Sequence, residues 1–238
     1  MPCPVPVPGG LSADWQYVLE NACYLGDGLA VTIELTVVSL LVGFAAGLPA
    51  GVVEVYGHRS DSRPVRWASG LVRNAGVVLR GTPIVVIIML AYFAAGISPA
   101  FLAATVSLGF RSAAYQAQIF RGAIESVDRG QMEAARAVGL SKLQSIRHVV
   151  LPQALRRSVP GFQNEVTIVL KDTSIAFAIG LAELLTNSYD LFQSIGHTTA
   201  IFEVILFVSG LYFVLTFSAN RALEALNDAV AIPGGERG

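Results

Sequence analysis

Of the ionisable side chains that interrupt the apolar stretches of the sequence, Arg111, Lys171 and Asp172 are the most expensive to leave in lipid. A charged side chain at the centre of a bilayer costs roughly 2.5–3.5 kcal/mol on insertion scales, so such residues face a helix-bundle interior or a wet cavity. Lys171 and Asp172 are adjacent and project about 100° apart on a helix, so each needs a partner other than its neighbour. Arg111 is the candidate partner of Asp172.

Two interpretations of these charges stay open. Together with Thr173 and Ser174, they would line a polar route through the membrane. Alternatively, they form an internal salt-bridge network that fixes the register of two helices, since buried charge pairs often have that role. The histidines His58, His148 and His197 are scattered without the spacing of metal ligands, so no metal site is predicted.

The elements that position these residues are predicted to be membrane helices. The 238 residues are 53% hydrophobic and only 14% charged, whereas a soluble domain carries about 25% charged residues. The charges are also clustered and leave long apolar runs between them. Five apolar segments are expected to span the membrane, at residues 29–53, 81–97, 100–120, 161–185 and 200–219. The predicted class is an all-α membrane protein with about five spans.

The second segment is short for a span. Thr82 and Pro83 predict an N-cap followed by proline at the first helical position. A helix over residues 83–97 would be about 22 Å long, less than the roughly 30 Å of the hydrocarbon core. Either the helix starts before Arg80, or the second and third spans form a tight hairpin.

The positive charges indicate the orientation. Lys and Arg are absent from residues 1–28 and 182–200, whereas residues 54–80 and the stretch around 121–157 are rich in arginine. The positive-inside rule therefore predicts an outside amino terminus and a cytoplasmic carboxyl terminus. The expected organisation is an extracytoplasmic segment 1–28, a membrane domain 29–220 with a cytoplasmic loop 121–160, and a cytoplasmic tail 221–238.

The amino-terminal region gives few further signals. Its first ten residues lack the basic region and apolar core of a signal peptide. Cys3 and Cys23 both precede the first apolar run and have no spacing signature, so they are interpreted as unpaired thiols. A disulfide is the alternative if that end of the chain faces an oxidising compartment.

Residues 130–160 form a polar, arginine-rich island between the apolar segments. A helix is predicted over Gln131–Val138, with Gly139 as its C′ stop. Ser141 and Gln144 form a capping box that opens a second helix, which should stop before Pro152. The bend carries the small residues Ala134, Ala135 and Gly139, which would let another protein approach closely. A loop that only satisfies its own hydrogen bonds is the alternative, but loops of this length are usually functional.

At this point the chain resembles the permease subunits of binding-protein-dependent ABC importers, and within them the polar amino acid branch. The resemblance covers residues 28–225 and rests on several motifs in the expected order. They are Arg80-Gly81-Thr82-Pro83, Ala114-Tyr115, Ile119-Phe120-Arg121-Gly122, Glu133-Ala134-Ala135 with Gly139, Leu151-Pro152-Gln153-Ala154, Asn164, Leu170-Lys171-Asp172-Thr173-Ser174 and Glu183-Leu184. The chain departs from the family pattern at Gln118, where glutamate is usual, at Gly161, where a second proline is frequent, and at Met132, where an aromatic is frequent.

The resemblance implies a type I importer permease without catalytic residues of its own. The island would be a coupling helix in the groove of a cytoplasmic ATPase dimer, which binds ATP and Mg²⁺. Glu133, Ala134, Ala135 and Arg136 would meet that ATPase, and Gly139 and Ser141 would shape the bend. Further implied partners are an extracytoplasmic solute-binding protein and a second permease subunit, identical or related; no nucleic acid is expected.

The resemblance also implies a substrate. A polar amino acid such as glutamate or glutamine would pass along Arg111, Gln118, Lys171, Asp172, Thr173 and Ser174. The carboxylate of a zwitterionic amino acid needs a donor, and its ammonium group needs an acceptor. Gln118 in place of glutamate, together with Arg111 and Lys171, favours acidic or neutral substrates over basic ones.

Two other functions remain as alternatives. The chain could be a stand-alone secondary transporter, although such carriers usually show duplicated halves and no internal repeat is visible here. It could also be a membrane scaffold whose island recruits a cytoplasmic protein. The sequence contains no Gly-x-x-x-x-Gly-Lys-Ser/Thr loop, so ATP hydrolysis would belong to a partner.

Overall fold

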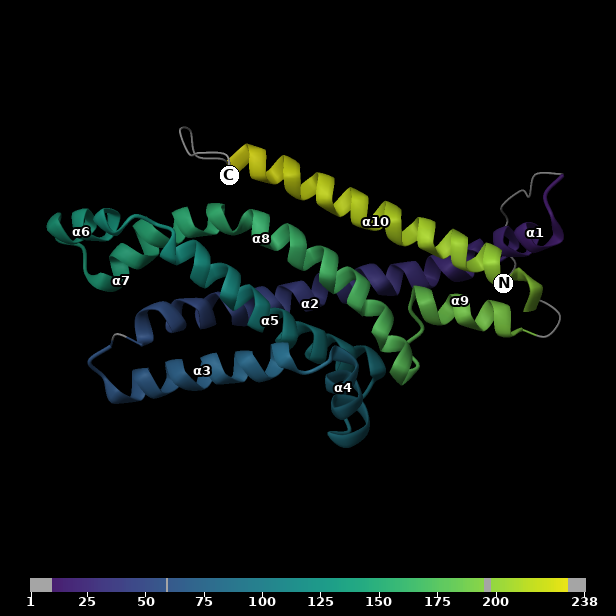
Figure 1. Ribbon diagram of the computed structural model, residues 1–238, viewed down its shortest axis with the longest axis horizontal. Helices are drawn as coiled ribbons and strands as arrows, with labels where there is room; N and C mark the ends of the chain where they lie inside the picture. The colour runs from purple at the N-terminus through teal and green to yellow at the C-terminus, as the bar shows by residue number, and fades with distance from the viewer. Residues whose placement is uncertain (1–9, 59, 195–197, 231–238) are drawn as a thin grey trace. The chain divides into compact units, whose positions relative to one another are not determined.

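The computed structural model describes residues 10–58, 60–194 and 198–230, and every regular element within them is helical (Figure 1). The α-helices are α1 (Ala13–Glu20), α2 (Ala22–Gly57), α3 (Arg63–Gly81), α4 (Ile84–Met89), α5 (Ala100–Glu125), α6 (Arg129–Ala137), α7 (Lys142–Ser145), α8 (Leu151–Asp172), α9 (Leu184–Gln193) and α10 (Ile201–Val230). Two π-helical segments, η1 (Leu90–Ala94) and η2 (Ile146–Val150), and two 3-10 segments, η3 (Thr173–Ile179) and η4 (Thr198–Ala200), complete them. The predicted all-α class is confirmed. Cys3, Arg59, His197 and Arg237 lie outside the described residues.

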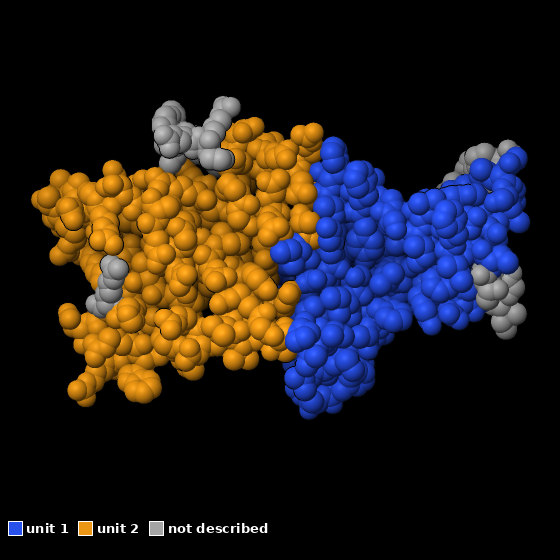
Figure 2. Space-filling model, in the orientation of Figure 1, with its two compact units in different colours: residues 1–39, 83–108, 168–218 blue, residues 40–82, 109–167, 219–238 orange. Residues whose placement is uncertain are grey.

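The chain forms two compact units, each assembled from three stretches of sequence (Figure 2). Unit 1 contains residues 1–39, 83–108 and 168–218, and unit 2 contains residues 40–82, 109–167 and 219–238. The four long helices α2, α5, α8 and α10 therefore each contribute residues to both units.

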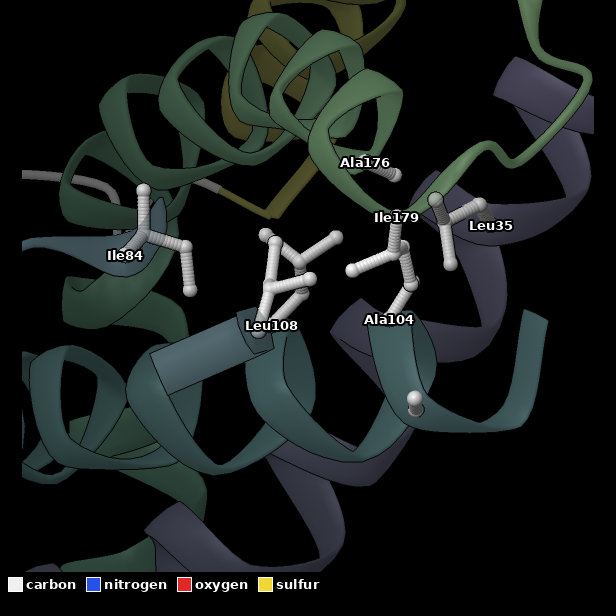
Figure 3. Packing of buried hydrophobic residues seen from close by; sticks show 8 residues of the cluster. Leu35, Ile84, Ala104, Leu108, Ala176 and Ile179 are labelled. Atoms are coloured by element: carbon white, nitrogen blue, oxygen red, sulfur yellow. The ribbon is translucent and has the colours of Figure 1, made fainter. Parts of the chain in front are cut away.

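Unit 1 has two apolar clusters. In the first, Leu35 of α2 and Leu108 of α5 pack with Ile84 and Ile88 of α4 and with Ile179 of η3 (Figure 3). The second cluster joins α1, α2, α9 and α10 through the buried residues Val18, Leu25, Leu184, Leu191, Ala200, Val204 and Val208. Burial of these side chains ties the short helices α1, α4 and α9 to the long ones.

Unit 2 is built around a close contact between α2 and α5. Gly43, Gly47 and Gly51 recur every four residues and so share one face of α2. A Cβ added at Gly47 would lie 2.8 Å from the carbonyl oxygen of Ala113, and one at Gly51 would lie 2.8 Å from Cβ of Phe120. Only glycine lets the two backbones come this near, which is the packing of small-xxx-small membrane helices.

The structure corrects the expectation for the Thr82-Pro83 step. Thr82 is the C-cap of α3, where its hydroxyl donates to the carbonyl of Val78 at 2.8 Å, rather than the N-cap of the next helix. The arginine-rich stretch before it forms the 19-residue helix α3. The helix expected over residues 83–97 is shorter and covers residues 84–94, where α4 continues into η1 without a break. Proline at position 83 has no N–H to continue α3, so a new helix begins after it.

Two further expectations are wrong. The segment 161–185 is not one helix, because α8 ends at Asp172, η3 follows, and Gly180 adopts a left-handed φ of +71°. The second island helix also does not stop before Pro152, since α7 leads through η2 directly into α8. In the wider π turn, the N–H of Leu151 bonds the carbonyl of Ile146, which shifts the hydrogen-bond register just ahead of the proline.

Among the described residues, α2 and residues 201–229 of α10 are long and apolar enough to cross a membrane, and α3 with the segment 84–94 qualifies only as a broken pair. The count of five spans stays a prediction. Cys23 is disulfide-bonded, which corrects its interpretation as an unpaired thiol, and Cys3 lies outside the described residues.

Candidate functional site

The polar island folds as the predicted pair of short helices with a tight bend. Asp128 is the N-cap of α6, and its carboxylate accepts a hydrogen bond from the N–H of Gly130 at 2.7 Å. At the other end Gly139 has a φ of +91°, and the N–H of Leu140 bonds the carbonyl of Ala135 at 3.2 Å. This is a Schellman stop, for which glycine at C′ is preferred because it has no Cβ.

The second helix begins with the predicted capping box. The N–H of Gln144 donates to Oγ of Ser141 at 3.3 Å, and the N–H of Ser141 donates to Oε1 of Gln144 at 2.8 Å. The guanidinium of Arg136 donates to the carbonyl of Leu140 at 3.1 Å and closes the bend from the α6 side. The predicted helix stop at Gly139 and the predicted capping box at Ser141 are therefore both present in the structure.

The exposed side chains of the bend are partly those that were predicted. Glu133, Ala134 and Arg136 are exposed, but Ala135 is only 5% exposed and packs inward, which corrects the expectation that it lies on the outer face. Two large apolar side chains, absent from the prediction, stand out: Val138 is 80% exposed and Leu143 is 74% exposed. Val138 precedes the bend and Leu143 follows it, and an apolar pair displayed in this way is typical of a binding surface.

The island rests on a small core of unit 2. Ala123, Ile124, Val127, Val150 and Ala154 form a buried cluster, against which Val52, Val55, Tyr56 and Met132 also pack. Nε2 of Gln153 donates to Oε1 of Gln131 at 3.3 Å, and the guanidinium of Arg157 donates to the carbonyl of Ser126. The first bond ties α6 to α8, and the second ties the turn between α5 and α6 to α8.

The residues predicted to line a route are distributed over both units. Arg111 and Gln118 belong to unit 2, where the Arg111 guanidinium lies 5.1 Å from the centroid of the Tyr115 ring and Gln118 is exposed. Lys171, Asp172, Thr173 and Ser174 belong to unit 1. The pairing of Arg111 with Asp172 would join the two units and stays a prediction.

The hydroxyls near Lys171 bond to their own helix. Thr173 is buried and donates to the carbonyl of Leu170 at 2.7 Å, while Ser174 donates to that of Lys171 at 2.7 Å. Lys171 itself is exposed. The two hydroxyls thus satisfy carbonyls at the end of α8, where the α-helical ladder stops.

A buried polar group in unit 2 was missed by the sequence reasoning. Oγ of Ser112 donates to Oε1 of Glu165 at 2.6 Å, and Nε2 of Gln116 donates to Oγ of Ser112 at 3.0 Å and to the carbonyl of Leu40 at 3.2 Å. The side chain of Glu165 is 3% exposed. Two sequence signals could have found it: a carboxylate inside an apolar segment, and the Gly-x-x-x-Gly spacing of α2 opposite it.

A second buried carboxylate, Glu183 in unit 1, was noticed only as part of a motif. It is the N-cap of α9 and accepts hydrogen bonds from the N–H groups of Leu185 and Thr186 at 2.9 and 2.7 Å. The hydroxyls of Thr186 and Tyr212 donate to it as well, at 2.9 and 3.2 Å. Four donors from two helices thus converge on one side chain.

Comparison with known proteins gives the family of the chain. The model of the family described as binding-protein-dependent transport system inner membrane component matches residues 43–231. The chain belongs to this family. The permease is 34% identical over 226 residues to the glutamine transport system permease protein of Escherichia coli K12, covering 92% of this chain and 98% of that protein. It is 30% identical over 230 residues to the glutamate/aspartate import permease protein of Escherichia coli O6:H1, with the same coverage.

A solved structure agrees with this assignment. A chain of the crystal structure of an amino acid ABC transporter with histidines superposes with a TM-score of 0.78 and 30% sequence identity. The match covers 92% of the permease and 100% of that chain. The type I permease fold is therefore confirmed, and the permease is an inner-membrane subunit of an ABC importer.

Proposed function

We propose that the permease translocates a polar amino acid, such as glutamate, glutamine or a close analogue, into the cytoplasm. Its relatives named above are permeases for glutamine and for glutamate and aspartate, and each is matched over nearly its whole length. Arg111, Gln118, Lys171, Asp172, Thr173 and Ser174 are the residues proposed to lie along the substrate path. Arg111 and Lys171 would attract the carboxylate groups of the substrate, and Asp172 would attract its ammonium group.

We propose that the exposed bend between α6 and α7 couples the permease to its ATPase. A separate ATPase dimer, with ATP and Mg²⁺ bound to it, would receive the bend in a groove. Val138 and Leu143 would provide apolar anchors there, and Glu133 and Arg136 would provide flanking charges, while Ala134 allows close approach. Gly139 and Ser141 keep the bend in shape. Closure of the ATPase pair would then move α6, and α6 would move α8 through the Gln131–Gln153 bond.

The remaining partners follow from the proposed orientation. Residues 1–28 would face outward, where a solute-binding protein delivers the substrate, and residues 121–160 and 221–238 would face the cytoplasm. A second permease subunit, identical or related, would complete the membrane part. The absence of positive charge from residues 1–28 and 182–200 supports this orientation.

The test is uptake into proteoliposomes that contain the permease, its ATPase and its binding protein. We expect ATP-dependent uptake of radiolabelled glutamine or glutamate. The double variant V138D/L143D should reduce uptake at least about tenfold and uncouple ATP hydrolysis from the binding protein, because two charges would be placed in an apolar groove. The control variant R147Q removes an exposed charge from η2 and should transport normally. Normal uptake by V138D/L143D would refute the coupling role of the bend.

A further inference from the structure

Unit 2 contains a cleft of about 780 Å³ that the transport function does not use. Its walls come from the end of α2, from α3, from the end of α5 and from α6. Arg66, Arg73 and Asn74 line the α3 wall, and Arg121 lines the wall of α5. Ligand pockets in proteins usually measure about 300–1,000 Å³, so the cleft has the size of a small-molecule or head-group site.

The guanidinium groups of this cleft have N–H donors that are available to bind a ligand. Within the described part of the chain, Arg66 donates only to backbone carbonyls, those of Ser60 and Asp61, at 2.8 and 3.1 Å. Arg73 has no hydrogen-bond or ion-pair partner anywhere in residues 10–58, 60–194 and 198–230. Nε of Arg121 is buried without a partner in the same part of the chain. A guanidinium group presents five donors in a fixed fork that fits phosphate oxygens.

Carboxylates also line the cleft, but none of them belongs to α3. Glu125, Asp128 and Glu133 line the α5 and α6 walls, and one oxygen of Asp128 already caps α6. Glu54 lies 4.0 Å from Arg121. Helix α3, by contrast, carries four arginines and no acidic residue. An anionic group would therefore bind on the α3 wall.

Helix α3 also presents an uncovered apolar face. Trp67, Leu71 and Val78 are 81%, 72% and 65% exposed, and their spacing of four and then seven residues places them on one side of the helix. Next to them, Arg66, Gly70 and Asn74 line both the cleft and a shallow groove that reaches Trp67 and Leu71. Apolar surface and phosphate-binding donors thus adjoin on one helix.

This combination is typical of a helix that contacts lipid. An arginine in the hydrocarbon core would cost about 2.5–3.5 kcal/mol, so the arginine face of α3 is unsuited to contact acyl chains. A helix with arginines on one face and Trp and Leu on another can contact head groups with the first face and acyl chains with the second. Basic pockets at the cytoplasmic surface are suited to acidic lipid head groups.

We propose that the cleft binds the phosphate of an anionic phospholipid, whose acyl chains lie against Trp67, Leu71 and Val78. Arg66 and Arg73 of α3 hold the phosphate. The hydroxyls of a glycerol head group donate to Glu125 of α5, which lines the same cleft. In the orientation proposed above, this lipid belongs to the cytoplasmic leaflet, and the inference rests on the proposed function in that respect alone.

The test is native mass spectrometry of the full-length permease in detergent with added phosphatidylglycerol or phosphatidylethanolamine of equal chain length. We expect preferential retention of phosphatidylglycerol. R66Q/R73Q should reduce that retention about thirtyfold, since each arginine near a membrane surface contributes roughly fivefold. R63Q/R147Q removes two exposed arginines that do not line the cleft, one of them on the same helix, and should retain the lipid as the wild type does. W67A/L71A should also lose lipid although its charge is unchanged.

Each other outcome would overturn the proposal. Equal loss of lipid in R63Q/R147Q would mean general charge attraction, and equal retention of phosphatidylethanolamine would mean no preference for an anionic head group. Displacement of the lipid by millimolar inorganic phosphate, with W67A/L71A unaffected, would mean a phosphate site without a lipid. Thermal unfolding of each variant in detergent shows whether it is folded. Because lipid retention needs neither ATPase nor substrate, a failed uptake assay would leave this result unaffected.

Discussion

Two buried carboxylates, one in each unit, are bonded in different ways. Glu183 accepts two backbone N–H groups at the start of α9, so most of its bonding is local in sequence. Glu165 accepts the hydroxyl of Ser112, which belongs to another long helix, and Ser112 in turn accepts from Gln116. Glu183 caps the start of α9, whereas Glu165 links two long helices, α5 and α8. A carboxylate in an apolar segment is therefore no proof of a substrate site.

The largest effect should follow from E183A. It would remove the acceptor of four hydrogen bonds, including that of the Tyr212 hydroxyl. Loss of an N-cap costs about 0.5–2 kcal/mol and a buried unpaired donor about 1–3 kcal/mol, so we expect a loss of about 2–5 kcal/mol in stability. The midpoint of thermal unfolding in detergent measures it, with the exposed Asp27→Asn as control. Equal midpoints for E183A and D27N would contradict the role of Glu183 as a cap.

A smaller loss is expected from S112A, at about 1–3 kcal/mol, because it takes a hydrogen-bond donor from buried Glu165. The comparison is sharpened by a double-mutant cycle with E165Q. A coupling energy of about 0.5–3 kcal/mol would show that the two side chains act together across helices. Strictly additive effects would instead indicate that the Ser112–Glu165 bond does not link α5 and α8 energetically.

The substitution G43A tests the helix contact beside Glu165. Its Cβ would lie 2.4 Å from Nε2 of Gln116 and 2.9 Å from Oγ of Ser112, so one of these side chains must move. We expect a loss of about 1–3 kcal/mol, toward the low end because a glutamine amide can turn aside. G210A on α10 is the matched control, since nothing lies within 4 Å of its added Cβ. A destabilisation by G210A as large as that by G43A would contradict the steric role of Gly43 in the contact between α2 and α5.

The smallest effect is expected from S141A, which removes a helix cap at an exposed site. It should cost about 1 kcal/mol locally, as other N-cap replacements do. The four residues of α7 contribute little to global stability, so the midpoint of thermal unfolding should hardly change. Hydrogen exchange at the N–H of Gln144, which Ser141 caps, should become faster. Unchanged exchange there would mean that the cap contributes nothing to α7.

Local signals predicted the bend between α6 and α7 well. Gly139 and the Ser141–Gln144 pair act within a few residues, so their hydrogen bonds follow from spacing alone. The same reasoning failed at Thr82, because a threonine between two helices can cap either one. It failed at Pro152 because a π turn changed the hydrogen-bond register ahead of the proline. It also failed for Ala135, whose burial depends on what packs beneath α6.

The sequence by itself determined the helical class, the exposed arginine-rich island, the shape of its bend and the family resemblance. These follow from composition, from short-range spacing and from motifs, which need no knowledge of what lies far along the chain. Only the tertiary structure decided that Tyr212 reaches Glu183, that Glu165 links α5 to α8, and which face of α3 stays uncovered. Those outcomes depend on contacts between residues 20 to 80 positions apart, as in the bond from Gln116 to Leu40. Close packing of the α2 glycines against α5 brings such distant groups within bonding distance.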